Sequence, residues 1–382
     1  MEGRLALRGG GPPGDRHLDR LSSHIPLSTQ FDGDEMKNLK KGGKEMRQKL
    51  QVYLRTLAIF SMAICTFLVF LGQAELARGE PYVLKAVTAW PKPVTDNKAF
   101  FIFLDTVKEK VAASCPGRLK IKYLGGPEAV KTMEQVHAVQ TGLIDMCYTT
   151  NAYYVSLLPE VDALKLSDFM PWEERDRGAW AYLNDLHEKR LGIHYLGRMG
   201  LGIRFHLYLI KAIQKADLKG LNIRVSPMYL QVVKALGGNP IVIPPTEVYT
   251  ALQRGVVDGY CWPSVGIRDW GWHKLTKYVV EPGFYQVPNP VLVNLKTWRK
   301  LPQELRDLLT EAAKEAERKA VAYFQDLARK DRPALLEAGI KVIDLPPAEK
   351  EKFLKAAYGA GWKDVLKKCP KTGPELKRLL TK

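Results

Sequence analysis

The chain has 382 residues, of which 46% are hydrophobic and 26% charged, the composition of an ordinary globular protein with two or three domains. Its 31 glycines and 24 prolines are too few for a collagen-like or low-complexity chain. A mean hydropathy of −0.20 excludes an integral membrane transporter. The net charge of +17 suits nucleic acid, an anionic surface or an anionic ligand, and does not choose among them.

The N-terminal part has the pattern of an export signal. Lysine and arginine are frequent at 37–55, an uninterrupted apolar run follows at 56–72, and small residues occur at 73–77. These are the three parts of a secretory signal, so we predict a leader at 1–77, cleaved after Ala74 or Ala77, and a periplasmic protein. The 17-residue run is also at the lower limit of a spanning helix, so a membrane-anchored ligand sensor is the alternative.

The basic excess belongs to the part that follows this leader. Setting aside residues 1–77 removes 11 basic and 8 acidic residues and leaves a net charge of +14. The charge is spread along the chain, with no arginine-rich run and no basic motif interleaved with aromatic residues. Because export also argues against a nucleic-acid partner, we predict that the protein binds none. The four cysteines after the leader allow three disulfide pairings, and the sequence does not choose one.

Strands and helices alternate in the first half of the exported part. Apolar periodicity predicts, in chain order, a strand at 82–90, a helix at 97–114, a strand at 119–124, a helix at 128–141 and a strand at 144–150. In the second of these helices Met133 and Val136 face inward, and Gly142 ends the helix. Alternation of this kind predicts βαβ units and a largely parallel sheet.

A second set of similar size begins near residue 203. It comprises a strand at 204–210, a one-turn helix at 217–220, a strand at 221–225, a helix at 229–236, a strand at 240–243, a helix at 246–254 and a strand at 256–262. A helical stripe then runs through 302–336. Two α/β sets without a soft linker predict two lobes, and ligands favour the crevice between lobes.

The motifs of common enzymes are missing from the sequence. There is no P-loop, GxGxxG, HExxH or GxSxG, and no two histidines stand at metal-ligand spacing. No set of residues provides a nucleophile, a base and an orienting group. We therefore predict a binding protein with no catalytic residues, no metal and no cofactor.

Two arginines stand inside apolar runs that are predicted to be strands. Arg204 follows Ile203, and Arg224 lies within 221–225. They could be two surface arginines that extend to solvent or pair with acidic residues. They could also clamp a carboxylate, because the arginine fork matches carboxylate geometry and a buried guanidinium without a partner is costly.

Four segments carry a family resemblance over nearly the whole exported part. They are GLIDM at 142–146, DLKGLNIRV at 217–225, EVYTALQRGVVDG at 247–259 and VNLKTWRKLP at 293–302. In this order they resemble the extracytoplasmic solute receptors of tripartite ATP-independent periplasmic (TRAP) transporters, the DctP-type family. The third segment is the most specific of the four.

The resemblance implies an α/β fold with two lobes of the periplasmic binding protein type and a long helix spanning both. It implies lobe I at 78–200, lobe II at 201–290, and a return segment with C-terminal helices at 291–382 that packs on both lobes. It also implies a function: capture of a small-molecule carboxylate between the lobes and delivery to TRAP permease subunits for uptake.

The resemblance further implies particular ligand-binding residues. Arg224 occupies the place of the arginine that pairs with the ligand carboxylate in this family, and Arg204 that of a second, assisting arginine. Asn151 falls in a loop that commonly adds polar contacts. The loop at 260–263 departs from the family, because it lacks a Gln-Glu-Asn sequence and also the Glu-Trp pair that holds a metal in the keto-acid and lactate branch.

Four aromatic residues near these positions bear on the ligand class. Trp90, Tyr153, Tyr154 and Trp262 could form an aromatic wall around an arginine-bound carboxylate, or they could simply pack in the lobe cores. On the first interpretation the ligand is a monocarboxylate with an apolar or aromatic body, rather than a C4-dicarboxylate or a sugar acid.

Overall fold

A computed structural model of the protein describes residues 33–76, 80–199 and 202–382. The chain divides into two compact units, residues 1–77 and 78–382, and each is described by itself. In the first unit the described residues form one helix, α1 (Gly33–Leu76). Of the predicted cleavage residues, Ala77 lies outside the described residues and Ala74 is described only as helical backbone. Across the described segments, no helix combines the length and the apolar character needed to cross a membrane.

The second unit contains two sheets, of which the first has five strands in the order β2-β1-β3-β10-β4. Its strands are β1 (Tyr82–Thr88), β2 (Leu119–Gly125), β3 (Met146–Tyr148), β4 (Ile193–Met199) and β10 (Asn289–Asn294). Strand β1 pairs in parallel with β2 and β3, as the alternation of strands and helices predicted. Strand β10 returns from the second half of the chain and pairs antiparallel with β3 and β4.

The second sheet has six strands in the order β11-β9-β5-β8-β6-β7. Its strands are β5 (Arg204–Leu209), β6 (Asn222–Val225), β7 (Asn239–Val242), β8 (Gly259–Pro263), β9 (Tyr278–Gln286) and β11 (Lys341–Asp344). Strand β6 is parallel to β7 and β8, whereas β5 is antiparallel to β8 and β9.

Helices cover these sheets. The α-helices of this unit are α2 (Lys98–Ser114), α3 (Gln135–Thr141), α4 (Pro171–Asp176), α5 (Ala179–Leu191), α6 (Leu230–Ala235), α7 (Val248–Gln253), α8 (Leu295–Lys300), α9 (Gln303–Glu337), α10 (Pro347–Lys368) and α11 (Gly373–Leu380). The 3₁₀ helices are η1 (Thr95–Asn97), η2 (Thr132–Glu134), η3 (Asn151–Tyr153), η4 (Pro159–Leu166), η5 (Pro227–Tyr229), η6 (Pro245–Glu247) and η7 (Trp272–Lys274).

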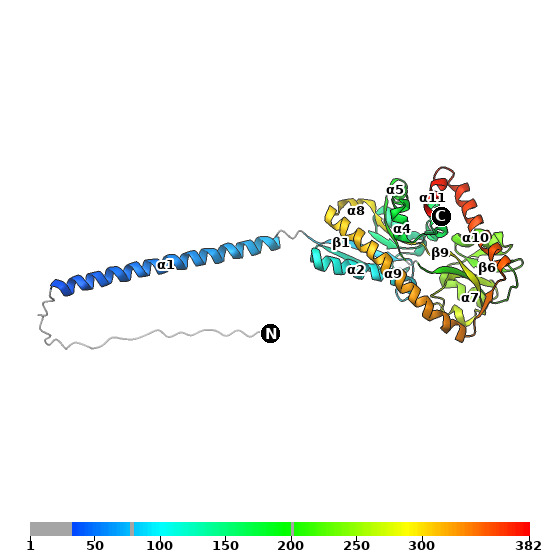
Figure 1. Ribbon diagram of the computed structural model, residues 1–382, viewed down its shortest axis with the longest axis horizontal. Coiled ribbons are helices and arrows are strands. Elements are labelled where there is room, and N and C mark those ends of the chain that lie inside the picture. Colours follow the sequence, from blue (N-terminus) through cyan, green and yellow to red (C-terminus); the bar gives the residue numbers. More distant parts are fainter. Residues whose placement is uncertain (1–32, 77–79, 200–201) are drawn as a thin grey trace, which may run out of the picture. The chain divides into compact units, whose positions relative to one another are not determined.

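The chain passes between the two sheets three times, after β4, after β9 and along α9. Helix α9 has 35 residues, about 50 Å at 1.5 Å per residue. Its first part packs on α2 and β4, and its end contributes Leu335 to a cluster of apolar side chains behind the second sheet. Figure 1 shows α9 crossing the unit from the side of α2 and α8 toward that of α7. The predicted two-lobed α/β fold with a long helix across both lobes is confirmed.

Some local predictions were wrong. Residues 217–220 form a turn instead of a helix, because the Asp217 carboxylate accepts the N–H of Lys219 at 2.9 Å and Gly220 has φ of +80°. The helix predicted from residue 128 begins only at η2, since the Glu128 carboxylate accepts the N–H of Gly126 and holds that segment as a turn. Met133 is consequently exposed, while Val136 is buried as predicted.

Candidate functional site

Two adjoining cavities lie between the ends of β1 and β6. We call the larger one, of about 280 Å³, the outer cavity, and the smaller one, of about 30 Å³, the inner cavity. Four residues line both: Trp90, Tyr153, Arg224 and Ser226. Other hollows are larger, including one of about 480 Å³ beside α2, but its Asp105 and Lys108 are exposed to solvent. The paired cavities are distinguished by buried charged groups.

Arg224 lies at the junction of the two cavities. Only 1% of its surface is exposed, and Nε donates a hydrogen bond of 2.8 Å to the carbonyl of Ile243, just beyond the neighbouring strand β7. Nη1 is buried without a partner, and no carboxylate of the described chain pairs with the guanidinium. Burial lowers the pKa of this arginine. A positioned guanidinium that lacks an anion is costly, so the site suits an anionic ligand.

Trp90 forms one wall of both cavities. Its carbonyl accepts hydrogen bonds from Thr88 Oγ1 at 2.9 Å and Asn97 Nδ2 at 3.0 Å, which fixes the loop after β1. The loop also lies so close to Gly126 that an added Cβ would stand 2.4 Å from the Trp90 carbonyl oxygen. The turn after β2 therefore requires glycine here, because a side chain would collide with the Trp90 backbone.

Several further buried donors have no hydrogen-bond partner in the part of the chain that the structure describes. The buried Oγ of Ser226 and the buried Nε1 atoms of Trp90, Trp262 and Trp270 have none, although each of these residues lines at least one cavity. Trp262 also lies under the guanidinium, with Arg224 Cζ 5.5 Å from its ring centroid. Donors of this kind match the oxygen atoms of a carboxylate.

Tyr153, in η3, also lines both cavities. Burial raises the pKa of its phenol to about 12 although the nearby Arg224 charge acts in the other direction, so the hydroxyl stays protonated and can donate. Its ring centroid is 6.4 Å from that of Trp90. Tyr153 and Trp90 therefore combine an aromatic wall with polar atoms, which is the arrangement that an acid with a flat or apolar body requires.

The sequence analysis missed a buried aspartate at the site. Asp96, in η1 at the start of α2, is 8% exposed and lines the inner cavity. Burial, reinforced by the negative charge of Asp269, raises the pKa of Asp96 to about 7. Ser226 and Phe205 were also missed. No motif marked these residues, because an aspartate at a helix start is indistinguishable in sequence from a capping residue.

Three predicted residues do not line either cavity. Register shifts on both sides of Phe205 interrupt the pairing of β5 with β9, and the exposed Arg204 extends to α10, where Nη1 donates to Tyr358 Oη at 2.8 Å. Asn151 and Tyr154 are buried in the core of the first sheet instead. Asn151 donates to the Val161 carbonyl at 2.7 Å, and Tyr154 Oη donates to Asn151 Oδ1 at 3.1 Å.

No group of three or more His, Cys, Asp or Glu side chains is arranged to hold a metal ion within residues 33–76, 80–199 and 202–382. The four described cysteines of the second unit, Cys115, Cys147, Cys261 and Cys369, are buried and free.

Comparison with known proteins identifies relatives of the second unit. Residues 92–368 match the family of bacterial extracellular solute-binding proteins, family 7 (DctP). A monocarboxylate 2-oxoacid-binding periplasmic protein of Nostoc sp. is 30% identical over 275 residues, covering 68% of this chain and 72% of that protein.

Solved structures share the fold. A Bordetella pertussis extracytoplasmic solute receptor binding pyroglutamic acid superposes with a TM-score of 0.68 at 21% identity, covering 78% of this chain and 99% of that one. A TRAP periplasmic solute-binding protein from Desulfovibrio salexigens with bound orotic acid gives 0.68 at 23% identity, with 78% and 97% covered.

Proposed function

Because the chain belongs to bacterial extracellular solute-binding protein family 7, the DctP-type receptors of TRAP transporters, we propose that it binds an organic acid between its two lobes and delivers it to TRAP permease subunits for uptake. The family is a transport family of extracytoplasmic receptors. The signal at 1–77 would direct the export, and the lobes would comprise 78–200 and 201–290, with the segment 291–382 packed on both.

One observation carries the carboxylate assignment. Arg224 is a buried guanidinium held by one backbone carbonyl, with no anion of the described chain beside it. Excluding water around such a charge strengthens its attraction for an anionic ligand. The buried donors of Ser226 and Trp262 add directional contacts for the carboxylate oxygens.

The wall of the outer cavity supports the ligand class. Away from Arg224 it is mainly apolar and aromatic, formed by Ala89, Trp90, Pro91, Pro127, Met133, Pro227, Val242, Ile243, Pro244, Pro245 and Trp270. A volume of about 280 Å³ suits a small acid. We therefore propose a monocarboxylate with an apolar or aromatic body. Similar proteins are described as binding monocarboxylate 2-oxoacids, pyroglutamic acid and orotic acid, which supports an organic acid as the ligand.

A thermal-shift screen against organic acids tests the proposal. The panel contains aryl and aliphatic monocarboxylates, a C4-dicarboxylate and a sialic acid. A ligand that binds only the native protein stabilises it by about 2.7 kcal/mol at a hundredfold excess over Kd, which raises the melting temperature. Arg224→Ala removes the carboxylate partner and should abolish this rise. Arg204→Ala, which removes an exposed arginine outside the cavities, should leave it unchanged.

Two results would contradict the proposal. A ligand that shifts Arg224→Ala as strongly as the wild type would place the carboxylate elsewhere. A preference for the dicarboxylate or the sialic acid over every monocarboxylate would refute the proposed ligand body while leaving the role of Arg224 intact.

A further inference from the structure

The inner cavity contains an acid that the carboxylate-binding role does not use. Asp96 is 8% exposed, lines this cavity together with Arg224 and Trp262, and forms no ion pair within the described part of the chain. Its neighbours do not neutralise it either. The titratable groups whose charges act on Asp96, or are acted on by it, are Asp269, Tyr148 and Tyr153, and none of them is a cation.

A glycine lies beside this carboxyl group. Gly266 has φ of +92°, and a Cβ at that position would stand 3.4 Å from both Asp96 Oδ2 and Trp262 Nε1. The Asp96 carboxylate and the Trp262 indole N–H therefore lie close together beside Gly266, and both residues line the inner cavity. A side chain at residue 266 would contact both polar groups, in addition to straining the backbone.

The chemistry of Asp96 differs from that of its surroundings. The cavity-lining atoms that are buried without a hydrogen-bond partner in the described residues can all donate, and they belong to Arg224, Ser226 and three tryptophans. An ionised carboxylate is an acceptor only, and a buried carboxylate without a partner is costly. Apart from a hydrogen bond from its own backbone N–H, which lowers its pKa, the Asp96 carboxyl group has acceptor sites left for a donor from outside the chain.

We propose that Asp96 accepts a hydrogen bond from a hydroxyl, amide N–H or ammonium group of the ligand, so that the receptor prefers organic acids bearing such a donor over unsubstituted acids. The inference rests on the proposed function, in which Arg224 holds the carboxylate. The ligand would then combine a carboxylate at Arg224, an apolar body in the outer cavity and a donor group that reaches Asp96.

This arrangement makes the preference dependent on pH. Burial and the adjacent Asp269 raise the pKa of Asp96 to about 7. Above that pH the group is an anionic acceptor, and a hydrogen bond from a donor group of the ligand strengthens binding. An unsubstituted acid cannot make this bond to the buried anion. At pH 5.5 the group is neutral, and the penalty for the unsubstituted acid falls.

Matched ligand pairs test the inference by isothermal titration calorimetry at pH 5.5 and 8.5. The pairs are 3-phenyllactate with 3-phenylpropionate, and 2-hydroxy-4-methylpentanoate with 4-methylpentanoate, which differ only by one hydroxyl group. For the wild type we expect the hydroxy acid to bind about tenfold more tightly at pH 8.5, the equivalent of one hydrogen bond of about 1.4 kcal/mol. The ratio should be smaller at pH 5.5.

Three variants separate the possible causes. Asp96→Leu should bring the ratio of affinities near one without loss of the unsubstituted acid. Asp96→Asn, whose amide oxygen can still accept, should keep part of the preference and lose its dependence on pH. The control Asp105→Asn makes the same change at an exposed position of α2 and should behave as the wild type.

The outcomes distinguish this inference from the proposed function. A ratio that survives in Asp96→Leu, or is already near one in the wild type, overturns the role of Asp96 while Arg224 keeps its own. If Arg224→Ala still binds the unsubstituted acids, or if the wild type binds none of the four acids, the proposed function fails and the inference fails with it.

Discussion

Buried charged residues inside and outside the cavities differ in whether they have an oppositely charged partner. Outside them, each has an opposite charge at hand: Arg198 pairs with Glu174, and Lys165 Nζ donates to Asp162 Oδ2 at 2.7 Å. At the cavities, Arg224 and Asp96 have no such partner in the described chain. Because an unpaired buried ion lowers stability, these two residues are the ones that a ligand of the proposed kind would stabilise.

Asp96 should make the ligand-free protein less stable as the pH rises. Its pKa is about 7 in the folded protein, against 3.8 for an ordinary aspartate. Between these values the folded state binds more protons than the unfolded state, so stability is highest at low pH and falls as the pH rises through 7. Asp96→Asn removes this loss and should stabilise the protein by about 2–4 kcal/mol at pH 8 and hardly at all at pH 4.

Chemical denaturation of wild type and variant across this pH range measures the effect. Asp105→Asn serves as the control and should show no gain that grows with pH. A constant difference between Asp96→Asn and the wild type from pH 4 to 8 would show that Asp96 does not titrate in this range.

At the scale of elements, α9 packs on the first sheet through a polar contact as well as an apolar face. Glu317, on the buried side of the helix, accepts hydrogen bonds from Arg175 Nη2 at 2.7 Å, Arg175 Nε at 3.1 Å and the backbone N–H of Arg198 in β4 at 3.2 Å. The helix also packs closely on β4 at Gly197, where an added Cβ would stand 2.5 Å from Glu317 Oε1. This contact fixes the rotation of α9 on the first sheet.

Breaking that contact should cost much more than a surface substitution on the same helix. Glu317→Ala leaves Arg175 without its partner and should reduce the free energy of unfolding by about 3–5 kcal/mol, as measured in urea. The exposed Glu304→Ala should change it by less than about 0.5 kcal/mol. The double variant Arg175→Met/Glu317→Leu should recover most of the loss, and equal losses in the single and double variants would refute the ion-pair explanation.

The order of the elements could be predicted from the sequence, because each strand or helix follows its own apolar periodicity. Boundaries failed where a side chain bonds to nearby backbone, as Glu128 does at Gly126. At the site, Arg224, Trp90, Tyr153 and Trp262 could be predicted as a group and do line the cavities. Asp96 could not, since its significance depends on burial and on the absence of a partner, which only the folded chain reveals.

At the scale of the whole second unit, the two lobes also touch beside the cavities. The N–H of Thr95, which precedes α2, donates a hydrogen bond of 2.7 Å to the Asp269 carboxylate, in the loop after β8. Asp269 lines neither cavity, but its negative charge raises the pKa of Asp96. The contact joins an element of the first sheet to a loop of the second, so it belongs to the conformation in which the lobes approach one another.

A ligand favours closure only through contacts that it makes better in the closed form, and contacts between the lobes add to that preference. Asp269→Ala removes the hydrogen bond to Thr95 without changing a residue that lines either cavity. Because it also removes a charge that raises the pKa of Asp96, the rates are compared at pH 8.5, where Asp96 is ionised in both proteins. We expect ligand to dissociate about three- to tenfold faster, since a hydrogen bond to a charged group at the surface contributes modestly. The association rate should change less.

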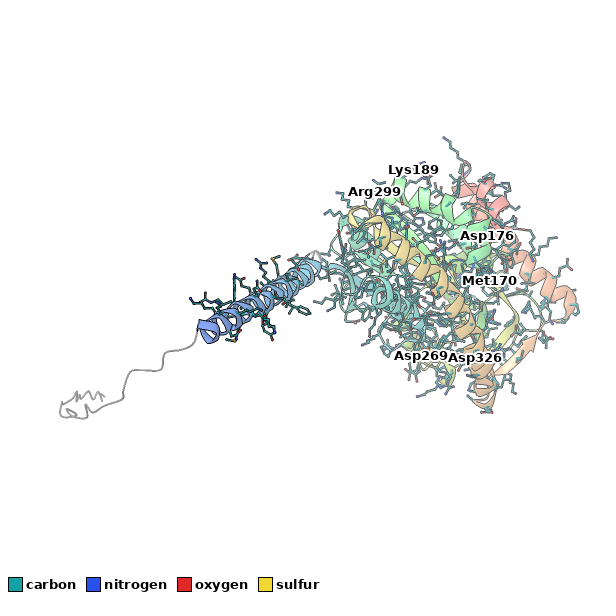
Figure 2. The ribbon with its side chains drawn as sticks, turned by 60° about the vertical axis from the view of Figure 1, so that its left-hand side comes forward. Met170, Asp176, Lys189, Asp269, Arg299 and Asp326 are labelled. Atoms are coloured by element: carbon teal, nitrogen blue, oxygen red, sulfur yellow. The ribbon has the colours of Figure 1, made fainter. Side chains whose placement is uncertain are left out.

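Stopped-flow measurement of the fluorescence of Trp90, Trp262 and Trp270, which line the cavities, gives both rates. Asp326→Ala is the matched control: this exposed aspartate pairs with Arg329 and Lys330 of its own helix and bridges no lobes. Figure 2 labels both aspartates, and each substitution removes one negative charge. If both variants speed dissociation equally, general electrostatics explain the effect; if only Asp269→Ala does, the contact with Thr95 helps to hold the lobes closed.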